Sequence, residues 1–440
     1  MNIAWVTPLS RRSAIGRVSA AIVKALRERD HEVMVIRSER ERADADSTHP
    51  ISGSVPIVWW TDVSPKDIEL HNDVVVLNFG DNYNFHAGAL AFVDRAFCLG
   101  IFHDFYLYSL FNRWLAHQGL GEDIHEREVR CTYGEEACQL ARRAWRGTAP
   151  VEELAEAMPM TEWLASRCGA ALAHSQFYSH RLEDSCPGPI SVAPLCYEPR
   201  GTTPLSRRHD DRVTIAILGV INPNKCVEAV IRSIASSGLL RARCRLRLVG
   251  IIDDAERNRI EQLCNSTEFT DVTILGEVDD AVLAKELDGA DILSCLREPV
   301  LEGASASAIE GMKAGRPIVV ASAGFYSELP DDLVFKIPAP VSVSELTQVL
   351  ERLVEDENLR RDTAAQAQRW ALRTFTTDGY VSILENLMRD YISAKPLLAA
   401  GKRIGHQLAA LGISTGDPGV KQIASKLQLL FSPSTIKASG

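Results

Sequence analysis

The sequence predicts an α/β protein made of two similar doubly wound parallel sheets that face a central cleft, with helices at the C-terminal end. Three observations lead to this fold class. Short apolar runs alternate with segments of helical spacing, which is the pattern of right-handed βαβ units. The alternation restarts after a polar, turn-rich stretch at 197–212, and residues 341–394 then have helical spacing throughout. A chain of 440 residues also exceeds the size at which one core keeps growing, so two domains are expected.

In the first half, apolar runs bounded by turn residues predict the strands of one sheet. A strand at 2–8 precedes a loop, a helix and a second strand within 14–36. Further apolar runs lie at 55–60, 73–79, 96–104, 170–182 and 190–195, and helical spacing lies at 85–96 and 105–118. A charged, helix-favouring stretch at 121–168 interrupts this alternation.

The second half repeats the pattern. Strands are predicted at 213–220, 244–250, 271–276, 291–296 and 316–324, and helices at 224–238, 254–266 and 279–290. Ligands of such sheets bind beyond the carboxyl ends of the strands. A cleft between two of these sheets is therefore the expected site for two substrates.

Composition excludes several classes of protein. The net charge of −10, without a basic aromatic motif, argues against nucleic-acid binding. None of the ten cysteines forms a Cys-x-x-Cys pair, which favours reduced thiols in a cytoplasmic protein over zinc or redox sites. No run approaches the roughly eighteen apolar residues that a bilayer span requires, so we expect a soluble protein or one attached to a membrane surface.

The stretch at 298–320 carries the clearest chemical pattern. Glu302 and Glu310 bracket seven residues that are nearly all Gly, Ala or Ser. Small residues at a helix start let a ligand approach backbone N–H groups, which favour anions. We expect Glu302 in the loop and Glu310 about two turns into the helix, where carboxylates would accept hydrogen bonds from vicinal hydroxyls. An ordinary Ala-rich helix with a solvent-facing Glu310 is the alternative.

Residues 302–317 resemble the Glu-x7-Glu signature of glycosyltransferase family 4, the retaining enzymes of GT-B fold with two Rossmann-like domains. The match covers both acids, Gly303, Met312, Gly315 and Pro317. Ala304 and Ser305 replace the Phe-Gly that the family has. The loop therefore keeps its small side chains and loses an aromatic one.

The resemblance extends to other segments of the C-terminal half. Lys225 aligns with the lysine that binds the donor's diphosphate, whereas the family's arginine falls on Val220. Arg297 is a candidate replacement for that missing cation. Backbone near Val278 would meet the nucleotide base.

Two N-terminal segments are also similar to the family. The loop after the first strand, which faces donor phosphate, keeps one of the usual paired glycines, Gly16. The strand-end His103 lies where a side chain would touch the sugar or the acceptor. A structural histidine is the alternative for His103.

The resemblance implies a retaining transfer of a hexose-type sugar from a nucleotide-diphosphate sugar to a glycan or lipid-linked acceptor. It implies front-face attack, with the departing phosphate helping to deprotonate the acceptor, and a role in surface polysaccharide or glycoconjugate synthesis. No cofactor and no obligate metal are implied. The implied catalytic residues are Lys225, Glu302 and His103. The implied donor-binding residues are Gly16, Val278, Ala304, Ser305, Ala306 and Glu310.

Four regions are expected in such a chain. They are an acceptor-side domain at 1–200, a donor-binding domain at 211–375, a helix at 376–394 that returns to the first domain, and a basic tail at 395–440. Residues 420–431 of the tail place apolar side chains on one helical face, which suits an anionic membrane surface, the protein's own surface or a second subunit. Two other functions stay open: a non-catalytic sugar-nucleotide scaffold or sensor, and a sugar-nucleotide epimerase.

Overall fold

The computed structural model describes residues 1–42, 47–51, 53–198, 212–413, 419–420 and 423. The first sheet has seven parallel strands in the order β3-β2-β1-β4-β5-β6-β7. These strands are β1 Asn2–Thr7, β2 Glu32–Arg37, β3 Ile57–Trp59, β4 Val74–Phe79, β5 Leu99–Phe102, β6 Ala170–Ala173 and β7 Ile190–Val192. All six residues of β4 are buried, because helices cover both faces of a parallel sheet.

The second sheet has six parallel strands in the order β10-β9-β8-β11-β12-β13. They are β8 Val213–Leu218, β9 Cys244–Val249, β10 Val272–Gly276, β11 Ile292–Ser294, β12 Ile318–Ala321 and β13 Phe335–Ile337. The predicted strands of both halves are present, whereas β13 was not predicted from the sequence. Lys336 interrupts the apolar residues of β13, so the sequence shows no continuous apolar run there.

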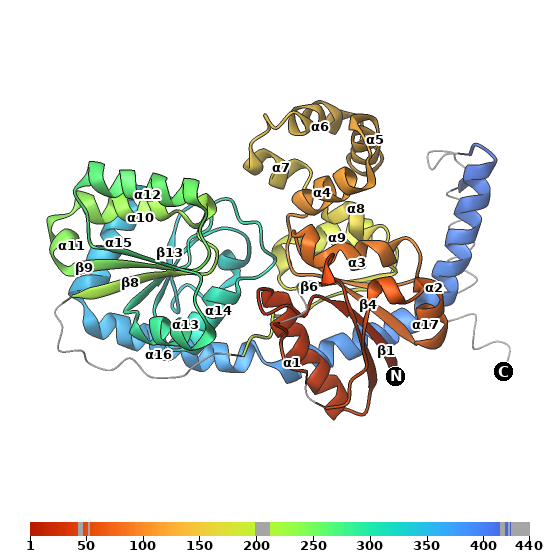
Figure 1. The fold of residues 1–440 in the computed structure, drawn as a ribbon, viewed down its shortest axis with the longest axis horizontal. Coiled ribbons are helices and arrows are strands. Elements are labelled where there is room, and N and C mark those ends of the chain that lie inside the picture. Colours follow the sequence, from red (N-terminus) through yellow and green to blue (C-terminus); the bar gives the residue numbers. More distant parts are fainter. Residues whose placement is uncertain (43–46, 52, 199–211, 414–418, 421–422, 424–440) are drawn as a thin grey trace.

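Helices flank the two sheets, which lie side by side in Figure 1. The helices of the first half are α1 Ala14–Glu28, α2 Pro65–His71, α3 Tyr83–Val93, α4 Tyr108–Gln118, α5 Glu122–Tyr133, α6 Cys138–Trp145, α7 Val151–Ala157, α8 Thr161–Ala165 and α9 Ser179–Ser185. Those of the second half are α10 Val227–Ser236, α11 Gly238–Arg243, α12 Asp254–Thr267, α13 Asp280–Gly289, α14 Ala306–Lys313, α15 Val343–Glu355, α16 Glu357–Thr374 and α17 Thr377–Ala410.

The stretch at 121–168 folds as α5 to α8. Helices α5, α6 and α7 form a small lobe beyond α4 and α8, away from the second sheet's core (Figure 1). The lobe is a helical insertion between β5 and β6, so the parallel sheet continues across it without a break in register.

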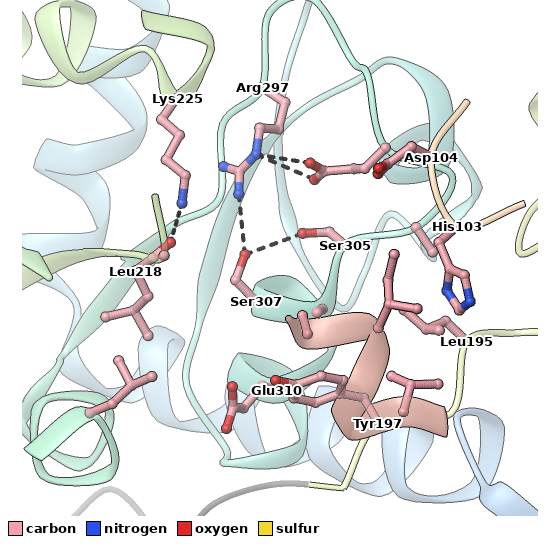
Figure 2. Close-up of a pocket in the computed structure, with 18 residues that line it drawn as sticks. His103, Asp104, Leu195, Tyr197, Leu218, Lys225, Arg297, Ser305, Ser307 and Glu310 are labelled. Atoms are coloured by element: carbon pink, nitrogen blue, oxygen red, sulfur yellow. Dashed lines mark hydrogen bonds and ion pairs between the residues drawn. The ribbon is translucent and has the colours of Figure 1, made fainter. Parts of the chain in front are cut away.

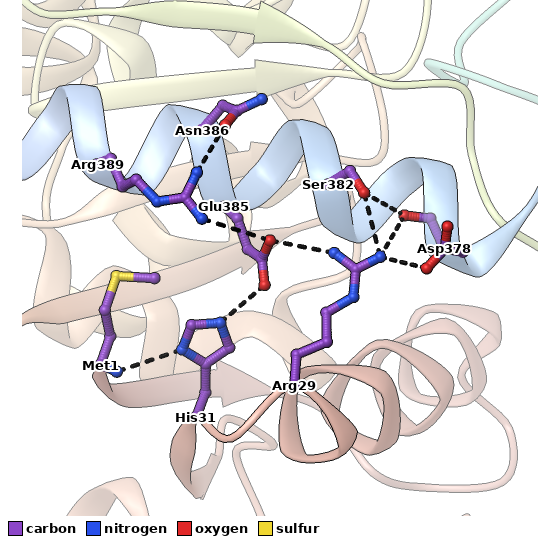
Figure 3. Close-up of polar contacts among 8 residues, drawn as sticks. All are labelled: Met1, Arg29, His31, Asp378, Ser382, Glu385, Asn386 and Arg389. Atoms are coloured by element: carbon purple, nitrogen blue, oxygen red, sulfur yellow. Dashed lines mark hydrogen bonds and ion pairs between the residues drawn. The ribbon is translucent and has the colours of Figure 1, made fainter.

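Helix α17 connects the second sheet back to the first domain, where it contacts α1, β6 and β7. Figure 3 shows the polar contacts that hold it: Glu385 accepts hydrogen bonds from Arg29 at 3.1 Å and from His31 at 2.8 Å. The helix runs to Ala410, through Pro396, beyond the boundary expected at 394. Its residues after 394 are rich in Leu, Ala and Lys, which are strong helix formers.

Two sequence predictions fall mostly outside the described residues: the linker at 197–212 and the amphipathic segment at 420–431. Among the helices described, none has both the length and the apolar character that crossing a membrane would require. The apolar core is partly shared between the domains. One buried cluster runs from Trp5 of β1 through Leu195 to Met312 of α14 and Tyr391 of α17.

Candidate functional site

A pocket of about 310 Å³ lies between the two domains, at the carboxyl ends of β5 and β8 and at the start of α14 (Figure 2). The sheets have their strand ends facing this pocket, as expected for ligand sites in open α/β folds. Its lining residues are Ala14, Ile15, Val18, His103, Asp104, Leu195, Tyr197, Leu218, Gly219, Lys225, Leu283, Arg297, Glu302, Ala304, Ser305, Ala306, Ser307 and Glu310.

The start of α14 forms one wall of the pocket. Ser305 is the N-cap, and its hydroxyl accepts a hydrogen bond from the backbone N–H of Ala308 at 3.4 Å. Because the helix begins at Ala306, Glu310 lies little more than one turn into it, and the expected two turns are wrong. Glu310 is buried and lines the pocket, so the solvent-facing alternative does not hold.

Two basic side chains lie on the same side of the pocket. The Lys225 Nζ donates to the carbonyl of Leu218, and Arg297 donates to the carbonyl of Leu296 at 2.8 Å and to Ser307 Oγ at 3.3 Å. Burial, followed by the neighbouring guanidinium, lowers the pKa of Lys225 well below its ordinary value. Val220 is 54% exposed and does not line the pocket. Arg297, by contrast, is buried and lines the pocket together with Lys225.

Glu302 is tied to Arg297. Its carboxylate lies 3.3 Å from the guanidinium and also accepts a hydrogen bond from the Tyr326 hydroxyl. Burial raises the pKa of Glu302, but Arg297, Tyr326 and Lys225 together outweigh it, so the pKa stays below its ordinary value. The carboxyl is therefore ionised at neutral pH and stays part of a charged cluster with both basic residues.

The ring of His103 is fully engaged by other protein groups. Asn78 donates through Nδ2 to the carbonyl of Val6 at 3.0 Å, so its Oδ1 accepts from His103 Nε2 at 2.9 Å. His103 Nδ1 then accepts from His174 Nε2 at 3.1 Å. Burial lowers the pKa of His103 well below its usual range, and that of His174 to about 4. A ligand can reach a ring nitrogen of His103 only if Asn78 or His174 releases it.

Asp104 follows His103 at the end of β5 and was missed as a site residue, although the strand-end His-Asp pair was visible in the sequence. One carboxylate oxygen, Oδ2, accepts from the backbone N–H of Asp81 at 2.8 Å. Burial raises the pKa of Asp104 to about 7; the Asp81 N–H opposes the shift and the nearby Glu302 carboxylate adds to it.

Two predicted site residues, Gly16 and Val278, do not line the pocket. Gly16 is buried in the first turn of α1, where a Cβ would lie 2.7 Å from the carbonyl oxygen of Pro8. It allows α1 to pack on the loop after β1, while its neighbour Ile15 lines the pocket. Val278 packs partly buried against the apolar core, whereas Leu283 of α13 lines the pocket.

The loop that carries Glu302 also joins the two domains. The N–H of Gly303 donates to the carbonyl of His103 at 2.9 Å, and the N–H groups of Phe105 and Tyr106 donate to the carbonyl of Leu301 at 3.0 and 2.9 Å. A Cβ at position 303 would lie 2.5 Å from the Tyr178 hydroxyl. Glycine is therefore required for this close approach.

The described part of the chain contains no group of three or more His, Cys, Asp or Glu side chains that could hold a metal ion. The positive charge available to an anion in the pocket comes instead from Lys225, Arg297 and the N-terminus of α14.

Comparison with known proteins adds a family match and several fold matches. Residues 205–370 match the model of a family described as "Glycosyl transferases group 1". The MMP alpha-(1->4)-mannosyltransferase of Mycolicibacterium hassiacum is 28% identical over 193 residues, 43% of this chain. The match covers 46% of that relative, so the chain spans about half of its length.

Solved structures match over most of the chain. Sucrose-phosphate synthase from Thermosynechococcus elongatus is 14% identical, with a TM-score of 0.59, over 90% of this chain and 100% of that one. Anabaena Alr3699/HepE, solved in complex with UDP and glucose, is 14% identical, with a TM-score of 0.57, over 88% of this chain and 99% of that one. These matches confirm the predicted fold of two Rossmann-like domains that face a cleft.

Proposed function

We propose that this chain, which has the GT-B fold and a group 1 glycosyl transferase domain, transfers a hexose-type sugar from a nucleotide-diphosphate sugar to a hydroxyl of a glycan or lipid-linked acceptor. The transfer retains the anomeric configuration and serves surface polysaccharide or glycoconjugate synthesis. One observation carries the proposal: Lys225, Arg297 and the start of α14 line the same pocket as Glu302 and Glu310.

The diphosphate binds at the basic end of this pocket. Lys225 and Arg297 are buried to about the same degree, 5% and 6% exposed, so their charges act with little screening by water. Together with the helix N-terminus they stabilise the charge that grows on the leaving phosphate, which is commonly the largest catalytic contribution. Burial lowers the pKa of Lys225, and an arriving diphosphate opposes this shift by favouring the charged form of the ammonium group.

The two acids bind hydroxyl groups. Glu310 accepts the vicinal ribose hydroxyls, since a carboxylate takes two donors at once. The side chain of Glu302 is 22% exposed, and this exposed part contacts the transferred sugar. Arg297 and Tyr326 hold the Glu302 carboxylate in place. The side chains of Ala304, Ser305 and Ala306 are small, so the donor can approach the backbone N–H groups of this loop and helix start.

The comparisons support this choice of substrate. HepE has been solved with UDP, with UDP and glucose, and with UDP-glucose. The curated relative is a mannosyltransferase, which also moves a hexose. Both are consistent with a nucleotide-hexose donor for this chain.

Calorimetric titration with UDP-glucose, GDP-mannose and ADP-glucose tests the proposal. We expect one donor to bind and to be turned over with release of its nucleoside diphosphate. Lys225→Ala should weaken binding roughly 10- to 150-fold, because a hydrogen bond to a charged group contributes about 1.5–3 kcal/mol. Lys66→Ala, an exposed lysine on α2, is the matched control and should bind normally.

The reaction products separate this proposal from the two other functions. A scaffold or sensor would bind donor without any turnover. An epimerase would convert one sugar nucleotide into another without an acceptor. If none of the three donors binds, the proposed function is wrong.

We propose a cytoplasmic location, with the basic region at 395–440 docking on an anionic membrane surface through its part beyond residue 402, because Lys395 pairs with Glu69 and Lys402 lies over the Phe97 ring. Cosedimentation with vesicles containing 30% phosphatidylserine, with and without residues 411–440, tests this. A chain that stays in the supernatant in both forms and elutes as a dimer would assign the region to self-association.

A further inference from the structure

Tyr326 is a fully buried residue whose hydroxyl ends on the Glu302 carboxylate. Its side chain is 0% exposed, and its hydroxyl donates to Glu302 Oε1 at 2.5 Å. Tyr326 belongs to the 3₁₀ turn η6, Gly324–Glu328, which follows β12, whereas Glu302 lies in the loop before α14. Burial raises the pKa of Tyr326 well above its ordinary value, so the hydroxyl keeps its proton and is the donor in this contact.

The second partner of the carboxylate, Arg297, does not by itself fix its orientation. A single guanidinium nitrogen, Nε, lies 3.3 Å from Oε1 and 3.4 Å from Oε2. An arginine that orients a carboxylate uses two nitrogens at about 2.7–2.9 Å, one for each oxygen. The terminal torsion of a glutamate also has no strong preference of its own. The hydrogen bond from Tyr326 is shorter and reaches one oxygen only, so it selects the orientation of the Glu302 carboxylate.

The Tyr326 hydroxyl is itself held in a fixed position. The ring packs edge-on against Phe325, with ring centroids 5.4 Å apart, inside the apolar core. Glu328 of the same turn accepts hydrogen bonds from the backbone N–H groups of Gln176 and Phe177 in the first domain, at 3.1 and 2.7 Å. Packing and these contacts hold η6 in place, so the hydroxyl is a rigid reference point for the carboxylate.

The orientation of Glu302 decides which oxygen a ligand meets. Glu302 lines the pocket, and with Oε1 engaged by Tyr326, Oε2 is the oxygen that can accept from a sugar hydroxyl. The position of such an acceptor affects the rate strongly, because a displacement of about 1 Å in an active site can cost roughly 100-fold. A residue that fixes this carboxylate therefore contributes to the reaction without touching the substrate.

Building on the proposed transfer, we propose that Tyr326 is a positioning residue: by holding Glu302 Oε1, it aims Oε2 at a hydroxyl of the transferred sugar. Tyr326 does not contact the donor and takes no part in proton transfer. The departing phosphate remains the group that helps to deprotonate the acceptor, as the family resemblance implies. The contribution of Tyr326 is to the turnover of the sugar nucleotide and not to the binding of its nucleotide part.

Tyr326→Phe tests this role, because it removes the hydroxyl and keeps the packed ring. We measure the affinities of UDP, GDP and ADP, and the affinity and turnover of UDP-glucose, GDP-mannose and ADP-glucose, with water and with methyl α-mannoside as acceptors. For the donor that is turned over, we expect its free nucleotide to bind within about twofold of the wild type, while kcat falls roughly 10-fold. Tyr391→Phe is the matched control and should keep the wild-type rate. Tyr391 is also 0% exposed, and its hydroxyl has no hydrogen-bond partner among the described residues.

Combination with Glu302→Ala separates positioning from a general structural role. If Tyr326 acts through Glu302, adding Tyr326→Phe to Glu302→Ala should lower kcat by less than about twofold further. The same addition should raise the melting temperature of the Glu302→Ala protein, because it removes a buried hydroxyl that has lost its acceptor. Thermal unfolding of each variant measures this effect and shows that the protein is folded.

Three results overturn the positioning role. They are a wild-type kcat in Tyr326→Phe, equal weakening of free nucleotide and sugar nucleotide in that variant, and a further 10-fold loss of kcat when it is added to Glu302→Ala. Turnover of a donor by the wild type in those cases leaves the proposed function intact. If the wild type turns over none of the donors, both proposals fall.

Discussion

Replacement of Arg297 by methionine tests the charged cluster of the pocket most directly. The guanidinium is buried, lies 3.3 Å from the Glu302 carboxylate, and donates to the Leu296 carbonyl and to Ser307. Removing it leaves the largely buried carboxylate of Glu302 without its main positively charged partner. The expected cost of breaking such a pair is about 3–5 kcal/mol. Tyr326 and Lys225 remain near the carboxylate, so the lower end of this range is expected, roughly 3 kcal/mol.

Adding Glu302→Gln to Arg297→Met separates the effect on stability from the effect on UDP binding. In Arg297→Met alone, about 3 kcal/mol corresponds to a melting temperature lower by roughly 6–12 °C. The double variant no longer has the carboxylate that lost its guanidinium partner, and a glutamine still accepts from Tyr326. We expect it to recover more than half of the lost stability while UDP binding stays at least 10-fold weaker than in the wild type.

Circular dichroism melting and calorimetric titration with UDP measure the two quantities. Arg95→Met, an exposed arginine after α3, is the matched control and should change neither. If the double variant is no more stable than Arg297→Met, the two side chains are not coupled. If it binds UDP as tightly as the wild type, Arg297 has no part in holding the diphosphate.

Three further predictions address other parts of the molecule. Burial raises the pKa of Asp81 to about 8, so the folded state favours the neutral carboxyl and loses stability as pH rises toward 8. The free energy of unfolding of Asp81→Asn should therefore increase relative to that of the wild type between pH 5 and 8, by up to about 1.4 kcal/mol per pH unit, as measured by thermal melting. An equal difference at all pH values would contradict this. Gly303→Ala should force the loop away from the Tyr178 hydroxyl, cost about 1–3 kcal/mol, and enlarge the radius of gyration in small-angle scattering, and an unchanged radius would disprove the close contact. Glu385→Gln removes the charged partner of His31 and should speed tryptic cleavage within α17, while cleavage at the wild-type rate would show that the contact does not hold the helix.

Much of the fold could be predicted from the sequence because its signals are local. The apolar runs that became β1 and β8 need burial on both faces wherever they lie, and the restart of the pattern after the linker indicated a second sheet. The pairing of Glu302 and Glu310 with small residues also indicated a ligand-binding helix start. Strand-end residues meet at one edge of a parallel sheet, so Lys225 and Glu310 were expected near each other, and both line the pocket.

What the sequence could not decide depends on which side chains meet from distant segments. Val220 lacks a charge, and nothing local shows that Arg297, from another strand end, lies beside Lys225. Asn78 and His174 occupy both nitrogens of His103, and this exhausts its hydrogen-bonding capacity in a way that no spacing reveals. Periodicity determines which residues reach the end of a strand, but their partners, their burial and hence their pKa values arise only when segments distant in the sequence pack together.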